Sequence, residues 1–487
     1  MSEDPDDAPE TDSPSDDPVD DLVTTSHTLR TPDGDLGYTA TAGRIVLRHE
    51  KHTDGTFEGH RPHAEVFVTA YTLDGADPAT RPLTIAFNGG PGSSSVWLHL
   101  GLLGPRRVVM GDAGALTGPP WGLTDNAETL LAHSDLLFVD PVSTGYSRAV
   151  TGGKPADFHG YTPDVESVGE VIRLWVTRNH RWGSPKYLAA ESYGTLRAAA
   201  LAEHLQDRHG MYLNGLMLIS SVLDMATIRF TEGNDQPYAL FLPTYAAIAH
   251  FHGRAGDRAL PDVLADAEDF AAGEYPWALA RGNRLPDTDR DRVLSRLAAL
   301  TGLSTDYLRR VRLRPEHQRF FRELLRDEGR TVGRIDGRFT GWEDDDAGEV
   351  LSYDPSIAAI TGPYTAAVHT HVRGTLGYES DLPYEILTSR VHPWSFKEFE
   401  GRGVSVVGRL SAAMRANPHL RVHVACGYHD GATPYSAAES VLARLPIPDE
   451  LRDNIEVRYY EAGHMMYVHE PSRVRQSADL AEFVRAR

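Results

Sequence analysis

The 487-residue sequence predicts an α/β fold in which a mostly parallel central sheet is interrupted by a largely helical insertion. Two observations lead to this prediction. Short apolar runs that end in turn residues alternate with segments of helical period, which is typical of βαβ units and a parallel sheet. After residue 223 the alternation gives way to helix-period segments rich in Ala, Arg and Asp, and it resumes near the end of the chain.

The first 25 residues are expected to form a disordered acidic tail. Ten acidic residues and no basic residue lie within 1–21, so this segment holds almost half of the net charge of −21. It is rich in Pro and nearly free of large apolar side chains, which leaves it little surface to bury. It also lacks the basic start and apolar stretch of a secretory signal.

The composition of the remaining chain excludes several classes of partner. Its mildly acidic balance argues against nucleic acid and anionic lipid. No apolar run approaches the ~20 residues that a membrane-spanning helix needs. A single cysteine, Cys426, rules out an intrachain disulfide and suits a reducing compartment. We therefore expect a soluble, cytoplasmic protein with neither a nucleic-acid nor a membrane partner.

The expected sheet domain comes in two parts, residues 26–223 and 401–487, with a helical cap at 224–400. It begins with an antiparallel hairpin, because 43–50 and 64–73 alternate apolar and polar residues. The later strands read as unbroken apolar runs, as expected for strands buried on both faces. These runs are 82–90, 134–145, 186–194, 215–221, 420–431 and 455–464, and the predicted helices include 162–180, 194–208, 261–275, 288–300 and 436–445.

A glycine-rich turn, "NGGPG" at 88–92, follows the first of these runs. A phosphate-binding loop would need a following Lys, and none is present. A dinucleotide fingerprint would need a third glycine where Ser95 stands, and Pro91 removes one backbone donor. Nucleotide binding is therefore a weak interpretation. A tight turn with positive φ and a loop that binds an oxyanion remain as alternatives.

A second turn, "AAESYGT", joins a predicted buried strand to a helix and places Ser192 at the junction. This is the setting of a nucleophile elbow, G-x-S-x-G, with Ala190 in place of the first glycine. The alternative is a serine that only caps the N-terminus of the helix and has no catalytic role. A serine nucleophile also requires a histidine base that is oriented by a carboxylate.

α/β-Hydrolases place these groups in the chain order Ser, Asp or Glu, His, each after a strand end. Asp430 follows one late strand, and His464 follows the next in a turn of small residues. In the same fold the oxyanion hole takes one N–H from the residue after the nucleophile, here Tyr193, and another from an earlier loop, here the turn at 88–92. The competing candidates are His423, His429 and His469 for the base and Asp449 and Asp453 for the acid.

Four ordered motifs, "NGGPGSSS", "ESYGT", "GYHDGATPY" and "AGHMMY", resemble those of the serine carboxypeptidases, peptidase family S10. The segment "LLFVDPVSTGYSRA" is similar to the family's Asp-Pro-Gly-Tyr/Phe-Ser segment, and 362–387 resembles the end of the helical insertion in bacterial members. The resemblance extends from about residue 40 to the end of the chain. It implies an α/β-hydrolase fold and removal of C-terminal residues from peptides.

The resemblance also implies roles for individual residues, which are Ser192 as nucleophile, His464 as base, Asp430 as its partner, Gly90 and Tyr193 as oxyanion donors, and Asn88 and Glu191 as the site for the substrate's C-terminal carboxylate. Two carboxylates attract each other only if they share a proton, which raises one pKa. No cofactor and no metal is implied. The expected partners are peptides with a free C-terminus.

Two positions depart from the family pattern. Leu102 stands where secreted members have a Glu before Leu-Gly-Pro, so the carboxylate site is expected to lose one acid. Ser93 replaces the Cys that follows Gly-Pro-Gly. The first departure leaves an esterase or acyltransferase on the same triad as an alternative function. A catalytically inactive binding protein is a third possibility, against which the complete Ser, Asp and His set argues.

Overall fold

The computed structural model describes residues 17–32 and 34–486. Its main element is a sheet of ten strands in the order β1-β2-β3-β7-β4-β9-β10-β13-β14, with β8 paired to β3. Along this spatial order, the first three neighbouring pairs, β1-β2, β2-β3 and β3-β7, are antiparallel, and all the following pairs, from β7-β4 to β13-β14, are parallel. The strands are β1 Asp21–Thr31, β2 Gly34–Thr53, β3 Thr56–Leu73, β4 Leu83–Phe87, β7 Asp135–Val139, β8 Arg148–Ala149, β9 Lys186–Glu191, β10 Gly215–Ile219, β13 Arg421–Gly427 and β14 Ile455–Tyr460.

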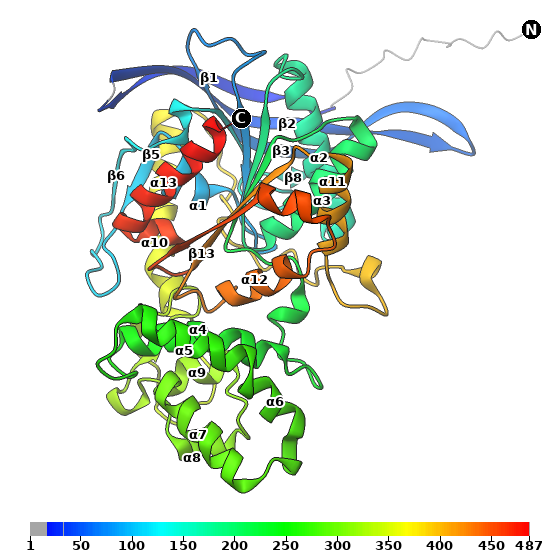
Figure 1. The fold of residues 1–487 in the computed structure, drawn as a ribbon. Helices are drawn as coiled ribbons and strands as arrows, with labels where there is room; N and C mark the ends of the chain where they lie inside the picture. Colours follow the sequence, from blue (N-terminus) through cyan, green and yellow to red (C-terminus); the bar gives the residue numbers. More distant parts are fainter. Residues whose placement is uncertain (1–16, 33, 487) are drawn as a thin grey trace, which may run out of the picture.

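Helices cover both faces of this sheet (Figure 1). The helices α2 Tyr161–Arg178, α3 Tyr193–His209 and α11 Val407–Ala416 pack together on one face, and α13 Glu470–Arg485, α1 Val96–Leu98 and α10 Pro355–His369 lie on the other. In β10, Leu216 and Leu218 join the core on the α3 side, whereas Met217 and Ile219 join the opposite core. Two buried faces explain why the parallel strands read as unbroken apolar runs.

A helical cap with its own apolar core lies below the sheet in Figure 1. It packs against α12 Tyr435–Ala443, where the Tyr435 hydroxyl donates to Glu268 Oε1 at 2.7 Å and the Ser436 hydroxyl donates to the Leu240 carbonyl. Its helices are α4 Gln236–Phe251, α5 Leu260–Ala272, α6 Glu274–Arg281, α7 Asp287–Thr301, α8 Thr305–Arg310 and α9 His317–Glu323. Two short antiparallel ribbons lie outside the main sheet, β5 Arg106–Val109 with β6 Gly122–Asp125 and β11 Thr331–Val332 with β12 Thr340–Gly341.

The central strand β9 leads through a strained turn at Ser192 directly into α3. A mostly parallel sheet with this strand, turn and helix at its centre is the α/β-hydrolase fold. The predicted fold class is therefore confirmed. The predicted hairpin is present as β2 and β3, although both strands are longer than the alternating segments. No helix within residues 17–32 and 34–486 has the length and apolar character needed to cross a bilayer.

Two predicted domain boundaries differ from the structure. The expected tail, 1–25, ends too late, because β1 begins at Asp21 and pairs with β2 along its whole length. The β-branched residues of "LVTTSHTL" favour this strand, and Leu29 is buried. Residues 1–16 lie outside the described residues.

The expected cap, 224–400, also extends too far. The residues Ile360, Tyr364 and Val368 of α10 belong to the sheet's apolar core together with Trp97, rather than to the core of the cap. The apolar core of the cap therefore extends to Val332 in β11, and α10 belongs to the sheet domain.

Candidate active site

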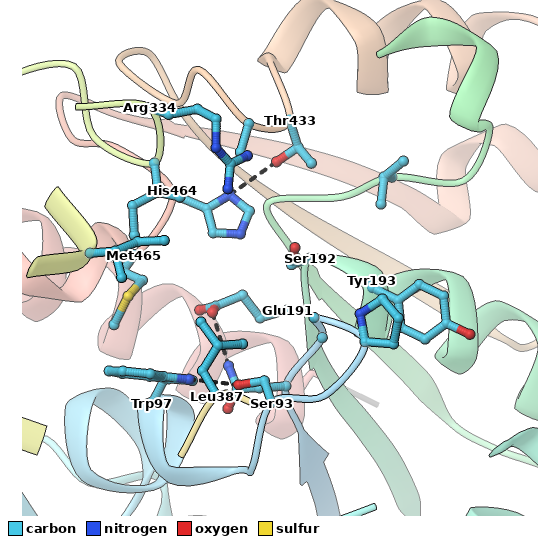
Figure 2. A pocket seen from close by; sticks show the side chains of 18 of the residues that line it. Ser93, Trp97, Glu191, Ser192, Tyr193, Arg334, Leu387, Thr433, His464 and Met465 are labelled. Atoms are coloured by element: carbon cyan, nitrogen blue, oxygen red, sulfur yellow. Dashed lines mark hydrogen bonds between the residues drawn. The ribbon is translucent and has the colours of Figure 1, made fainter. Parts of the chain in front are cut away.

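A cavity of about 570 Å³ opens beside the carboxyl ends of the central strands. This edge of an open parallel sheet is where α/β proteins bind ligands. Its lining includes six of the seven residues predicted to act on substrate, namely Asn88, Gly90, Glu191, Ser192, Tyr193 and His464. The seventh, Asp430, lies behind His464 and is fully buried. The structure thus brings together side chains from widely separated parts of the sequence (Figure 2).

Ser192 occupies a strained turn at the N-terminus of α3. Its φ of 59° and ψ of −130° are rare for a residue with a side chain, which is the mark of a nucleophile elbow. The Ser192 N–H donates to the Ile219 carbonyl at 3.0 Å, and the Thr195 hydroxyl donates to the Ser192 carbonyl at 2.7 Å. These bonds hold the turn so that the serine side chain faces the cavity.

His464 and Asp430 form a hydrogen-bonded pair. The Nδ1 of His464 lies 2.8 Å from Asp430 Oδ2, and Figure 2 shows the imidazole directed toward the hydroxyl of Ser192. Asp430 is held in turn, because its Oδ1 accepts from the backbone N–H groups of Ala432 and Thr433, and its Oδ2 accepts from the Thr433 hydroxyl. This geometry favours the tautomer in which Nδ1 carries the proton and the other ring nitrogen is free to accept one.

The electrostatics of His464 suit a base. Burial opposes its charged form, but the Asp430 carboxylate, the hydrogen bond to that carboxylate and the nearby Glu191 outweigh burial, so the pKa of His464 lies above its ordinary value.

The competing histidines and acids lie elsewhere. None of His423, His429 and His469 lines the cavity. His423 pairs with Glu456 and His469 with Ser472, and burial lowers the pKa of His429 to about 3. Asp449 and Asp453 lie exposed in a 3-10 turn at Asp449–Asn454 and do not line the cavity.

The glycine turn lies directly against the N-terminus of α3. A Cβ added at Gly89 would stand 2.5 Å from the Tyr193 nitrogen and 2.9 Å from the Gly194 nitrogen, so only glycine permits this approach. Gly90 has a φ of +101°, which also favours glycine. The loop and the first N–H groups of α3 therefore meet beside Ser192, where an oxyanion would form. The sequence pattern predicts roles for Gly90 and Tyr193 but does not reveal the packing role of Gly89.

Replacing Gly89 by alanine is expected to lower kcat by about 10²–10³-fold, the effect of losing one oxyanion donor. The added methyl group would push the turn away from the Tyr193 N–H. Steady-state kinetics on a peptide substrate, with a thermal melt to verify folding, measure this effect. The control is Gly408→Ala, where an added Cβ meets no atom within 4 Å. A folded Gly89→Ala protein with unchanged kcat would remove this turn from the oxyanion site.

The predicted carboxylate-binding pair is in contact. Asn88 Nδ2 donates to Glu191 Oε1 at 2.9 Å. The second oxygen of Glu191 accepts from the Tyr467 hydroxyl at 2.7 Å, a contact that the sequence analysis did not predict although Tyr467 ends the motif "AGHMMY". Leu102 is buried in the apolar core and does not line the cavity. Within the described residues, the hydrogen-bond partners of Glu191 are thus two neutral groups, the Asn88 amide and the Tyr467 hydroxyl.

Glu191 is poised to change its protonation near neutral pH. Burial raises the pKa of Glu191 to about 7, although His464 and the hydrogen bonds from Tyr467 and Asn88 oppose this rise. A carboxyl group in this state can donate a hydrogen bond to another carboxylate, which an ionised one cannot.

Most of the other lining residues are apolar, which suits a peptide side chain. They come from the sheet domain and from the segments that precede and follow the cap. They include Trp97, Val222, Met225, Ile228, Ile335, Ile357, Ile360, Leu387 and Met465, and a single arginine, Arg334, lies among them. No motif in the sequence marks these positions, because their contribution depends on the fold alone.

Comparison with known proteins identifies relatives of the first part of the chain. Residues 63–236 match the family model described as serine carboxypeptidase. The pheromone-processing carboxypeptidase KEX1 of Yarrowia lipolytica is 32% identical over 163 residues, which cover 33% of this chain and 24% of that protein. Serine carboxypeptidase-like 16 of Arabidopsis thaliana is 27% identical over 173 residues, covering 32% of this chain and 38% of that protein.

Comparison with solved structures finds similar chains at low identity. The peroxisomal α/β-hydrolase Lpx1 of Saccharomyces cerevisiae matches with a TM-score of 0.36 at 12% identity, over 96% of this chain and 90% of that one. The N-acyl homoserine lactone degrading enzyme Est816 matches with a TM-score of 0.35 at 12% identity, over 88% and 99% of the two chains.

The sequence matches span about a quarter to two fifths of the length of these curated relatives. The family-model match includes Asn88, Gly90, Glu191, Ser192 and Tyr193, whereas Asp430 and His464 lie beyond it and are placed by the fold. Family model, relatives and motifs agree. Residues 63–236 of the chain are similar to the serine carboxypeptidases, peptidase family S10.

Proposed function

We propose that this protein is a serine-type carboxypeptidase that hydrolyses the last peptide bond of peptides through an acyl-enzyme. One observation carries the proposal: the Ser192 turn and the His464–Asp430 pair share a cavity with a buried carboxyl and amide, Glu191 and Asn88, next to the serine. A nucleophile beside a site for a terminal carboxylate selects the last peptide bond.

In the proposed reaction the Ser192 oxygen attacks the carbonyl carbon of that bond, and its proton passes to His464. The carbonyl oxygen becomes an oxyanion, which the N–H groups of Gly90 and Tyr193 stabilise. His464 then protonates the leaving nitrogen, the C–N bond breaks, and the last residue departs. Water, deprotonated by the same imidazole, hydrolyses the serine ester and restores the enzyme. Asp430 holds the imidazole and stabilises its charged form.

Glu191 and Asn88 would bind the C-terminal carboxylate of the substrate. The amide of Asn88 can donate, and Glu191 donates while it is protonated. Because the pKa of Glu191 lies at about 7, the neutral form dominates below that pH and the charged form above it. Binding of a free C-terminus should therefore weaken as the pH rises above 7. Burial, rather than a second acid, keeps Glu191 neutral up to a pH of about 7, so the site would work close to neutrality.

The ratio of kcat/KM for a free peptide to kcat/KM for its C-terminal amide is expected to exceed one and to fall above pH 7. The fall approaches tenfold per pH unit, because the fraction of neutral Glu191 declines by that factor. Taking the ratio removes the requirement for His464 as a base, which both substrates share. Residue release from the two peptides, followed between pH 5 and pH 9, measures it.

The matched control is Glu191→Gln, which keeps a neutral hydrogen-bonding side chain at every pH. Its ratio is expected to stay constant across the same range. Equal rates on free and amidated wild-type substrates would argue for the alternative, an esterase or a broader hydrolase on the same triad. Peak activity below about pH 5, near the ordinary carboxyl pKa, would contradict the proposed neutral site.

A further inference from the structure

Arg334 is the single arginine that lines the cavity within the described residues, and no lysine accompanies it. It lies between the short strands β11 and β12, directly before Ile335, whose carbonyl accepts the backbone N–H of His464 at 2.6 Å. Its side chain is 33% exposed, and Figure 2 shows it beside the imidazole of His464. A positive charge thus lies next to the proposed catalytic pair and is open to the cavity.

The guanidinium of Arg334 has unused hydrogen-bond donors. Its nearest carboxylate is Asp354, with 3.9 Å between Nε and Oδ2, which is too long for a hydrogen bond. The oxygens of Asp354 already accept from the backbone N–H groups of Arg334, Ile335 and Ser356 and from the Ser356 hydroxyl. Within the described part of the chain, the guanidinium makes no hydrogen bond.

A nearby arginine has the opposite environment. The buried Arg338 donates to both oxygens of Asp336, at 3.0 and 2.6 Å, and its charge is therefore used within the protein. The N–H groups without a hydrogen-bond partner are therefore specific to Arg334, and Arg338 in the same loop does not share this property.

The cavity offers no carboxylate that neutralises Arg334. The other titratable side chains in its lining are Glu191, His392, His464 and Tyr193. Glu191 is engaged by Asn88 and Tyr467, and Asp430 is buried behind His464. An arginine that is partly desolvated, has a carboxylate only at 3.9 Å and makes no side-chain hydrogen bond among the described residues favours a ligand with a carboxylate, which its planar group binds through two parallel N–H···O bonds.

We propose that Arg334 binds the side-chain carboxylate of an acidic residue in the substrate, at the position immediately before the last residue. This inference rests on the proposed function and adds a substrate class to it. In Figure 2, Arg334 and Glu191 lie on opposite sides of the pair formed by His464 and Ser192. If the last residue is held at Glu191, the residue on the acyl side of the cleaved bond lies toward Arg334.

The test compares four peptides that carry Glu or Gln at either the penultimate or the last position and are otherwise identical. The wild-type protein is expected to release the last residue at least tenfold faster, in kcat/KM, when the penultimate residue is Glu rather than Gln. A charged hydrogen-bonded pair produces a preference of about this size. Arg334→Gln should abolish the preference, so that the penultimate Glu and penultimate Gln peptides are cleaved at equal rates.

Two further variants serve as controls. Arg334→Lys keeps the charge but not the paired N–H groups, so part of the preference should remain. Arg444→Gln removes an exposed arginine that directly follows α12 and whose side chain donates to Ser440, and it should leave the preference unchanged. The inference is overturned if the wild-type protein shows no preference for penultimate Glu, or if the preference appears only at the last position. It is also overturned if Arg334→Gln slows all four peptides equally.

A second measurement separates this inference from the proposed function. A fluorophosphonate probe reports on Ser192 whether or not peptides are cleaved. If no peptide releases a residue, the carboxypeptidase assignment fails, and protection against the probe still tests Arg334. N-acetyl-Glu-Ala should protect the wild-type protein at least tenfold better than N-acetyl-Gln-Ala does, and Arg334→Gln should remove that difference. Equal protection by the two dipeptides would overturn the inference.

Discussion

Replacement of Ser192 by alanine is expected to abolish covalent labelling by a fluorophosphonate probe and to reduce peptide hydrolysis about a millionfold. Loss of the nucleophile in a serine hydrolase removes nearly all of the rate, because the remaining groups act only in concert with it. The change removes one oxygen atom from a partly exposed side chain, so the fold should persist. Gel-based labelling and a residue-release assay on the purified protein measure both effects.

A matched serine tests whether the loss is specific. Ser167 lies in α2, where its hydroxyl donates to the Asp164 carbonyl, and Ser167→Ala should label and hydrolyse like the wild-type protein. Labelling that survives Ser192→Ala would refute the nucleophile assignment. A wild-type protein that neither labels nor cleaves any peptide would favour the inactive binding protein instead.

The sheet could be predicted from the sequence because burial on both faces leaves a clear pattern. Strands such as β9 and β10 are short apolar runs that end in turn residues, and the helices between them have a clear 3.6-residue period. The strand β1 escaped prediction because the acidic composition before it obscured a run of threonines and valine, which gains stability only by pairing with β2. Such pairing is a tertiary effect that composition does not reveal.

The boundary of the cap was missed for a related reason. The sequence of α10 is helical and apolar, and that pattern alone does not say which core it joins. Its Ile360 and Tyr364 pack beside Trp97, which lies more than 250 positions earlier in the chain. Helical period predicts the element, whereas only the fold determines its neighbour.

Some residues of the candidate site could be predicted from sequence motifs, whereas others could be identified only from the fold. Ser192, Asp430 and His464 could be singled out because each follows a strand end in a turn whose residue types serve a chemical purpose. Gly89 could be seen as a turn residue, but its contact with the Tyr193 nitrogen could not. Tyr467 and Arg334 carry no motif of their own, since a tyrosine or an arginine is unremarkable until the fold places it against a buried carboxyl or an open cavity.

Replacement of Asp430 by asparagine is expected to lower kcat by about 10⁴-fold while leaving the fold intact. The Oδ1 of Asp430 accepts two backbone N–H groups, from Ala432 and Thr433, so the amide oxygen of asparagine should occupy that position. The NH₂ group would then face Nδ1 of His464, where the carboxylate oxygen now lies at 2.8 Å. Nδ1 must accept from this group, so its proton moves to the ring nitrogen that faces Ser192. An imidazole in that tautomer cannot take the serine proton.

The rate of probe labelling should fall together with kcat, because both require the serine to lose its proton, while KM should change little. A time course of probe labelling and the steady-state release of the last residue, both at a pH near 7, measure the two rates. Asp449→Asn provides the control, since that exposed acid pairs with Arg452 and should be dispensable. A folded Asp430→Asn protein with kcat within tenfold of the wild-type value would show that the carboxylate neither sets the tautomer of His464 nor stabilises its charge, and the assigned triad would then be wrong.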